Sequence, residues 1–197
     1  MTCNFLFRPQ APEDDAAIET LHAQAFGPGR FARTAYRIRE ASRTGPLVAL
    51  TAWDGDRLAG VIHFTAITIG GRHGAALLGP LAIAPAYQNK GCGMRLITCG
   101  MAEVREQGYE LVILVGDLPY YRRAGFRAIP EGRIALPGPA NPARFLAAEL
   151  APDALAHFRG MAAADNEPLA TAPHELAGLH RRNIGREWAG GWQRACS

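Results

Sequence analysis

A glycine-containing loop followed by a helical pattern is the part of the chain best suited to bind a phosphate. The run Gln88–Gly93 reads Gln-Asn-Lys-Gly-Cys-Gly and follows an apolar segment that ends at Pro85. Glycine has no Cβ, so the backbone N–H groups near Gly91 and Gly93 can approach a phosphate closely. The first turn of the helix adds its partial positive charge. The sequence therefore predicts an anion-binding site at this loop.

Two other phosphate-binding motifs are excluded by the residues at key positions. A dinucleotide-binding loop needs a third glycine where Leu96 stands, and a P-loop needs serine or threonine directly after its lysine. Here Lys90 is followed by Gly91 and Cys92. Lys90 is the only lysine of the chain, and it is either a solvated surface residue or the partner of a ligand phosphate.

A second pattern lies further along the chain, where Tyr121 stands five residues before Phe126 of a Gly-Phe pair. Together with the Gln-x-x-Gly-x-Gly pattern of Gln88–Gly93, it resembles the two signatures of the GNAT superfamily of N-acetyltransferases. The resemblance covers roughly Phe5–Ile129, and segments such as Leu78–Leu81 are similar to a bacterial subgroup of predicted acetyltransferases. It implies an acyl-CoA-dependent N-acyltransferase.

The resemblance also implies a binding mode. The strand that ends at Pro85 and the strand Leu111–Val115 part like a V, and acetyl-CoA, the acyl donor, lies in the gap. A primary amine, on a small molecule or a protein, attacks the thioester directly, without a covalent enzyme intermediate or a metal. Tyr121 lies near the sulfur as general acid; otherwise it is a core aromatic residue, and Tyr120 packs or lines the acceptor pocket. The implied cofactor contacts are Leu81, Ala82, Ile83, Gln88, Asn89, Lys90, Gly91, Cys92, Gly93 and Met94.

The general base is the least defined part of the site. A primary amine with a pKa of about 10.4 must lose a proton before it can attack. Many GNAT enzymes use a glutamate on the central strands, but Ala75–Ala84 contains no acidic residue. His63, in the middle of a predicted strand, is either the base or a structural histidine. Asp117 is either the base or the cap of the next helix, and water with backbone carbonyls is a further alternative.

The elements expected around these residues form a mixed α/β (α+β) sheet with flanking helices, which differs from a doubly wound dinucleotide fold. The predicted order is a strand, two helices, three antiparallel strands, a helix, a strand, a short helix and a closing strand. We expect strands at Asn4–Arg8, Leu47–Trp53, Arg57–Ile69, Ala75–Ala84, Leu111–Val115 and Phe126–Ile129, and helices that begin near Pro12, Phe31, Gly91 and Pro119.

A change in composition divides the chain near residue 130. Residues 1–130 are predicted to form the acetyltransferase domain, and 131–197 a C-terminal extension that packs on it. The apolar content of this extension is high for a disordered tail, so we expect it to help shape the acceptor side. Phe145–Leu150 favours a short helix. Trp188 and Trp192 either pack on the sheet or join an interface of a homodimer.

Composition limits the class of protein further. The 197 residues carry a net charge of +3, which suits an anionic cofactor but does not indicate nucleic acid as a partner. The four cysteines lack metal-ligand spacing and are expected to be reduced thiols. With no signal peptide or membrane span predicted, we expect a cytoplasmic protein. The excess of arginine over lysine and the abundant alanine indicate a bacterial source. A non-catalytic acyl-CoA-binding or regulatory module is the alternative function. The missing strand glutamate favours this alternative slightly, whereas the Tyr121 signature favours catalysis more.

Overall fold

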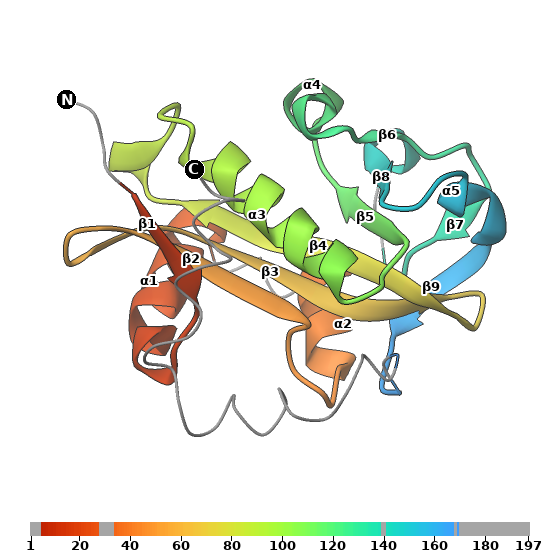
Figure 1. Ribbon diagram of the computed structural model, residues 1–197, viewed down its shortest axis with the longest axis horizontal. Coiled ribbons are helices and arrows are strands. Elements are labelled where there is room, and N and C mark those ends of the chain that lie inside the picture. The colour runs from red at the N-terminus through yellow and green to blue at the C-terminus, as the bar shows by residue number, and fades with distance from the viewer. Residues whose placement is uncertain (1–4, 28–33, 139–140, 168, 170–197) are drawn as a thin grey trace.

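Helices cover both faces of a central β-sheet (Figure 1). The computed structural model describes residues 5–27, 34–138, 141–167 and 169. Helix α3 (Cys92–Glu106) lies on one face, and α1 (Asp15–Phe26) and α2 (Thr34–Ala41) lie on the other. This arrangement confirms the predicted mixed sheet with flanking helices.

The order of strands in the sheet is β1-β2-β3-β4-β5-β8-β6. Strands β1 to β4 are antiparallel, β4 and β5 are parallel, and β8 is antiparallel to both β5 and β6. Strand β9 pairs with one end of β3 and with β7. The strands are β1 (Leu6–Pro9), β2 (Val48–Asp54), β3 (Arg57–Ile69), β4 (Arg72–Ile83), β5 (Leu111–Val115), β6 (Arg127–Ala128), β7 (Ile134–Ala135), β8 (Phe145–Glu149) and β9 (Gly160–Ala164).

Short helical turns connect these strands. A 3-10 turn at Pro12–Asp14 precedes α1, and another at Pro85–Tyr87 follows β4. Helix α4 (Leu118–Tyr121) and the 3-10 turn Arg122–Ala124 follow β5. A turn at Pro142–Arg144 precedes β8, and α5 (Ala154–His157) precedes β9. These turns place the loop before α3 and helix α4 at the ends of neighbouring strands.

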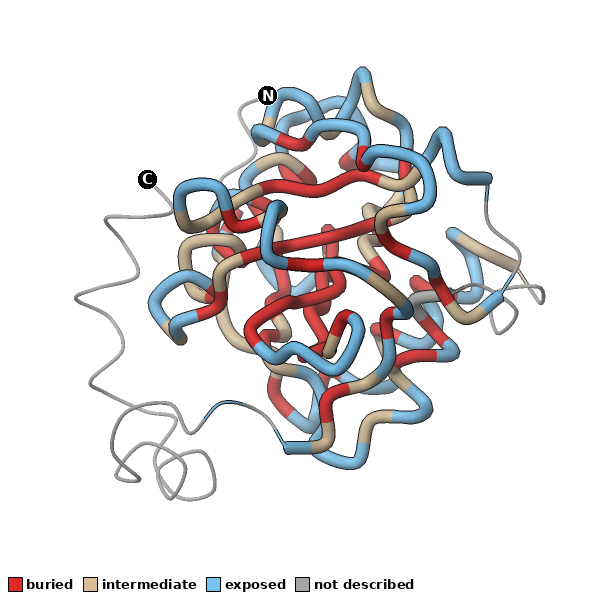
Figure 2. Tube along the Cα trace, turned by 90° about the vertical axis from the view of Figure 1, so that its right-hand side faces the viewer, coloured by how far each residue is buried: buried red, intermediate tan, exposed pale blue. Residues whose placement is uncertain are grey.

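Buried residues gather in the middle of the molecule (Figure 2), and their packing clusters show which face of the sheet each residue of β3 occupies. Ile62 and Phe64 are buried in the cluster that includes α3. Val61 packs with residues of α1, and Ile67 packs with Ile38 of α2. Because successive strand residues point to opposite faces, His63 lies on the face covered by α1 and α2.

Strand β8 corrects one expectation from the sequence. Phe145–Leu150 favoured a helix because leucine, alanine and glutamate have good helix propensity. That prediction is wrong, since every residue of Phe145–Glu149 pairs with β5, whose buried backbone N–H and C=O groups need hydrogen-bonding partners on the second edge of the strand. Strand β8 therefore lies between β5 and β6. The boundary at residue 130 stays a prediction, and Trp188 and Trp192 lie outside the described residues.

Three findings bear on expectations from composition. Within the described ranges, no helix is long and apolar enough to cross a membrane. The same residues contain no cluster of three or more His, Cys, Asp or Glu side chains that could hold a metal ion. Cys99 is disulfide-bonded, so the expectation of a reduced thiol is wrong there, whereas Cys92 is a buried cysteine outside any disulfide bond.

Candidate active site

The ladder between β4 and β5 opens part-way along the two strands. They pair in parallel only where Ala75–Leu77 meets Leu111–Ile113. Beyond this point Leu114–Val115 of β5 pairs with β8, while β4 continues to Ile83 beside β3. On its β5 side, the end of β4 therefore has backbone groups without a strand partner in the described part of the chain. We call this opening the β4–β5 gap.

The loop before α3 has the backbone shape that the glycine pattern predicts. Asn89 has φ 60° and Gly91 has φ 83°, and Gly91 is the N-cap residue of α3. No side chain in the described ranges caps this helix, and the N–H groups of its first turn have no intrahelical acceptors. The Lys90 Nζ atom lies 5.6 Å from the centroid of the Tyr87 ring. The loop can thus present several N–H donors and the exposed ammonium group of Lys90 to an anion.

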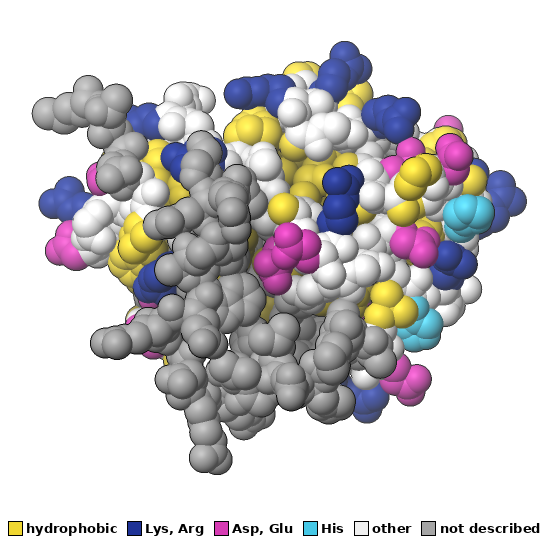
Figure 3. Space-filling model, viewed as in Figure 1, with side chains coloured by type: hydrophobic (Ala, Val, Ile, Leu, Met, Phe, Trp, Pro, Cys, Tyr) yellow, Lys and Arg dark blue, Asp and Glu magenta, His cyan; other side chains and the backbone are white. Residues whose placement is uncertain are grey.

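Positive side chains also lie around the end of β5. Arg122 and Arg123 follow α4 directly and are exposed. Figure 3 shows basic side chains along the upper edge of the molecule, where α4 lies, next to hydrophobic surface. A positive rim beside an apolar opening suits a cofactor that joins phosphates to an apolar chain.

Two adjacent tyrosines of α4 lie on the β5 side of the gap, in different surroundings. The Tyr120 hydroxyl lies against Gly93, where a Cβ would stand only 2.5 Å from it. The Tyr121 ring packs on Gly116, and its centroid is 5.7 Å from that of Phe126. Burial raises the pKa of Tyr121 to about 12 and also raises the pKa of Tyr120. Both phenols therefore stay protonated at neutral pH and can donate a hydrogen bond.

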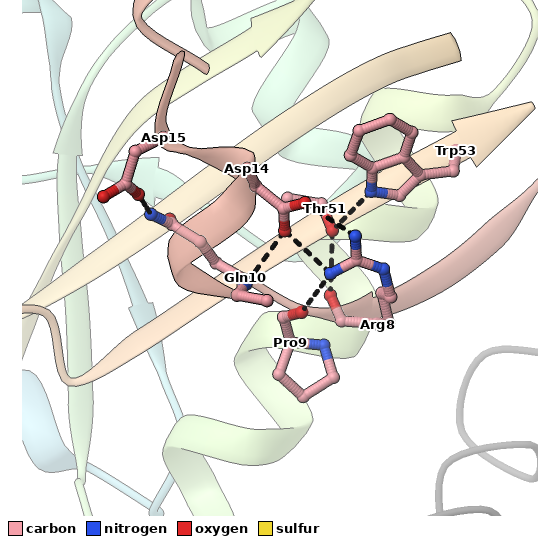
Figure 4. Close-up of polar contacts among 8 residues, drawn as sticks. Arg8, Pro9, Gln10, Asp14, Asp15, Thr51 and Trp53 are labelled. Carbon is pink, nitrogen blue, oxygen red and sulfur yellow. Dashed lines mark hydrogen bonds and ion pairs between the residues drawn. The ribbon is translucent and has the colours of Figure 1, made fainter. Parts of the chain in front are cut away.

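An ion pair joins strand β1 to the turn that precedes α1 (Figure 4). Arg8 donates from Nη1 and Nη2 to the two carboxylate oxygens of Asp14, each at 2.7 Å. Burial alone would raise the pKa of Asp14, but hydrogen bonds from Arg8 and from the Ala11 N–H, with the Arg8 charge, lower it. This pair holds β1 against the start of α1 and so places Gln10 over the sheet.

His63 stands in a chain of hydrogen bonds on the α1 and α2 face. Gln10 donates from Nε2 to Asp15 at 2.8 Å (Figure 4), and its Oε1 lies 2.7 Å from His63 Nε2. The Arg39 Nη1 atom lies 3.2 Å from His63 Nδ1. Because the amide oxygen only accepts and arginine only donates, Nε2 carries the proton and Nδ1 accepts.

This arrangement bears on His63 as a general base. Burial, followed by the charges of Arg39 and His22, lowers the pKa of His63 to about 3. Its remaining lone pair is already used by Arg39. The imidazole is therefore neutral and can take a proton only if Arg39 moves away from Nδ1.

Asp117, the other candidate base, lies at the N-terminus of α4. Asp117 is the N-cap residue of α4, as the capping alternative expected, but its side chain makes no capping hydrogen bond. It is exposed and pairs with Arg144 at 3.2 Å, next to the start of β8. Sequence reasoning could not find this partner, because β8 was expected to be helical.

The structure also adds residues that the sequence did not single out. Gln10 and Arg39 hold His63 from two different elements, and the Tyr120 hydroxyl lies at the start of α3. Of the predicted cofactor residues, Leu81, Ala82 and Ile83 line the end of β4, and Gln88 to Met94 form the adjoining loop and first turn. His63 lies apart from that loop, on the opposite face of the sheet.

Comparison with known proteins gives a consistent result. The family model described as acetyltransferase (GNAT) domain matches residues 7–129. The uncharacterized N-acetyltransferase YjhQ of Escherichia coli K12 is 32% identical over 126 residues, which cover 62% of this chain and 70% of YjhQ. YhbS of the same strain, also an uncharacterized N-acetyltransferase, is 27% identical over 158 residues, covering 79% of this chain and 93% of YhbS.

Two solved structures extend the comparison. A GNAT family acetyltransferase from Brucella melitensis, in complex with acetyl-CoA, has a TM-score of 0.65 and 30% identity, covering 83% of this chain and 97% of that one. The Escherichia coli YhbS structure, in complex with CoA, has a TM-score of 0.73 over 94% of this chain and 96% of that one. At 23% identity, the second structure shows the fold alone.

Proposed function

Because the chain belongs to the GNAT family of acetyltransferases, we propose that it transfers an acetyl group from acetyl-CoA to a primary amine at the β4–β5 gap. The protein is an acyl-CoA-dependent N-acyltransferase. The observation that carries the proposed site is the position of the gap, which opens beside the uncapped N-terminus of α3. CoA in the YhbS structure and acetyl-CoA in the Brucella melitensis structure support this cofactor.

In this proposal the cofactor uses backbone groups of β4 and of the loop. The amides of Lys90–Met94 surround the pyrophosphate, because a helix N-terminus attracts an anion. Lys90 leaves the Tyr87 ring to pair with a phosphate. The amide groups of the pantetheine chain then pair with the backbone edge of Leu81–Ile83, as a neighbouring strand would.

The chemistry follows from the groups beside the gap. The amine nitrogen forms a bond to the thioester carbon, the carbon–sulfur bond breaks, and the sulfur leaves as a thiolate. Tyr121 donates a hydrogen bond or its proton to that sulfur. A phenol with a pKa of about 12 is a weaker acid than a thiol of about 8.5, so hydrogen bonding contributes more than complete transfer. Water accepts the ammonium proton, unless Arg39 moves and exposes His63 Nδ1.

We further propose that residues after 130 help to shape the acceptor side. Support comes from a groove of about 450 Å³ in which Pro137 and β9 face α2. A bacterial cytoplasmic location and a homodimer are proposals that rest on the sequence alone.

A thiol-release assay tests the proposed function. Acetyl-CoA is incubated with the protein and a pool of primary amines, and free CoA is measured over time. Release that depends on the amines supports the transfer reaction. Calorimetric binding of acetyl-CoA without such release would support the non-catalytic module instead, and absence of binding would contradict both.

A further inference from the structure

Arg39 is a half-buried cation without a carboxylate partner among the residues that the structure describes. Its guanidinium lies 4.7 Å from the centroid of the Tyr36 ring and donates to His63 Nδ1. Neither contact neutralises its charge, because the imidazole is neutral. A cation removed from water usually has an anionic partner, since the loss of hydration is otherwise uncompensated.

The surrounding side chains hold this guanidinium in one place. Asp15 accepts from Gln10, Gln10 accepts from His63, and His63 accepts from Arg39. A carboxylate oxygen and an amide oxygen only accept hydrogen bonds, and a guanidinium only donates them, so this row of hydrogen bonds specifies the orientation of the imidazole. Arginine has five N–H donors, and the hydrogen bond to His63 uses only the Nη1 nitrogen of Arg39. The remaining donors make no hydrogen bond to another described residue and can bind a ligand.

The place of His63 in the sheet puts Arg39 near the proposed reaction centre. Ile62 pairs with Leu81 and Phe64 pairs with Leu78, so the bulge at Gly79–Pro80 stands opposite His63. Strand β4 leaves β5 directly before this bulge. Neighbouring strands are about 4.8 Å apart, so the gap lies one strand away from His63.

The amine can approach the gap from this face of the sheet. The proposed phosphate site lies with α3 on the opposite face, so the cofactor phosphates do not compete with the acceptor for the face that α1 and α2 cover. This face also holds a buried hydroxyl, Thr65 Oγ1, which makes no hydrogen bond to a residue that the structure describes. Thr65 is two residues from His63 and points to the same side of β3.

We propose that Arg39 binds a carboxylate of the acceptor, so that the substrate is an amine that also carries a carboxylate, as a free amino acid does. The planar guanidinium can form two parallel hydrogen bonds to a carboxylate. His63 is then a positioning residue that holds Arg39. This inference rests on the proposed acetyl transfer and adds the chemical class of its acceptor.

The test compares matched acceptors with acetyl-CoA as donor. Each of the nineteen standard amino acids that carry a primary amine is paired with its α-carboxamide, which keeps the amine and the side chain but removes the negative charge of the α-carboxylate. Amide formation lowers the pKa of the amine and so favours its attack, which means that a preference for the acid cannot come from amine reactivity. We expect kcat/KM to be about 10- to 100-fold higher for the acid form of the best pair, as for one charge-assisted interaction.

Variants of Arg39 assign that preference to the residue. Arg39→Gln should reduce the acid-to-amide ratio to about one, and Arg39→Lys should restore part of it. Arg43→Gln is the matched control, because Arg43 is exposed and lies only four residues further along the chain. All three variants should keep the acetyl-CoA affinity and the melting temperature of the wild type, which a merely structural loss would change.

The outcomes separate this inference from the proposed function. Equal use of acids and amides, or an unchanged ratio in Arg39→Gln, would overturn the inference alone. Acetyl-CoA binding without acetylation of any of the amino acids would also overturn it. Failure to bind acetyl-CoA would instead count against the proposed function.

Discussion

The backbone at Gly91 allows a direct test of the proposed phosphate loop. Gly91 has φ 83°, and no atom lies within 4 Å of the position that a Cβ would take. The change Gly91→Ala therefore introduces backbone strain without a steric clash. Gly108, beyond the other end of α3, is a matched control, because its φ is 82° and its Cβ position is equally open.

The expected size of the effect follows from this geometry. A left-handed conformation costs a residue with a side chain roughly 1–2 kcal/mol. If the backbone of the Gly91→Ala variant relaxes in the free protein, acetyl-CoA must restore the strained shape, and the affinity falls about 5- to 30-fold. The same strain in Gly108→Ala lowers the free energy of unfolding but leaves the cofactor site unchanged.

Calorimetry with acetyl-CoA and urea unfolding measure the two quantities separately. We expect Gly91→Ala to weaken acetyl-CoA binding and Gly108→Ala to reduce only the free energy of unfolding. Unchanged affinity in Gly91→Ala, or an equal loss of affinity in Gly108→Ala, would refute the assignment of this loop to the phosphates.

The two tyrosines and His63 provide three further tests. Tyr121→Phe should lower kcat up to about 10²-fold in steady-state kinetics with little change in acetyl-CoA affinity, and if Tyr120→Phe causes that loss instead, Tyr120 is the acid. Gly93→Ala brings a Cβ against the Tyr120 hydroxyl and should lower the free energy of unfolding by about 1–3 kcal/mol, but by less in a Tyr120→Phe background. An equal loss in both backgrounds, measured by chemical unfolding, would disprove the contact. The pKa of His63 is about 3 when folded and near 6.5 when unfolded, so the unfolded chain binds the proton first and stability falls as pH drops from about 6.5 toward 3. The decrease in the free energy of unfolding per pH unit should be about 1.4 kcal/mol smaller in His63→Asn than in the wild type. Urea unfolding at pH 6 and at pH 4.5 measures this decrease, and an equal decrease in both proteins would contradict the prediction.

Local patterns were enough to predict most elements of the fold. The predicted bounds of Arg57–Ile69 and Leu111–Val115 match β3 and β5, and α3 begins at Cys92 directly after its glycine N-cap. Alternation, apolar runs and glycine punctuation depend only on neighbouring residues, so they can be detected without the fold. Phe145–Leu150 failed because its helix propensity competed with an unpaired edge of β5, which no local pattern reports.

The candidate site likewise has one part that the sequence predicted and another that only the tertiary structure decided. The loop before α3 is contiguous, so the spacing of its glycines was sufficient to indicate how its backbone turns into the helix. The contacts of His63 join residues 53 and 24 positions away, and only the packing of β1 and α2 beside β3 brings them together. The different surroundings of Tyr120 and Tyr121 likewise depend on where α4 lies relative to α3 and β5. Side-chain identity can thus suggest a chemical role, but burial and the neighbours that the fold supplies determine which protons and lone pairs are available for it.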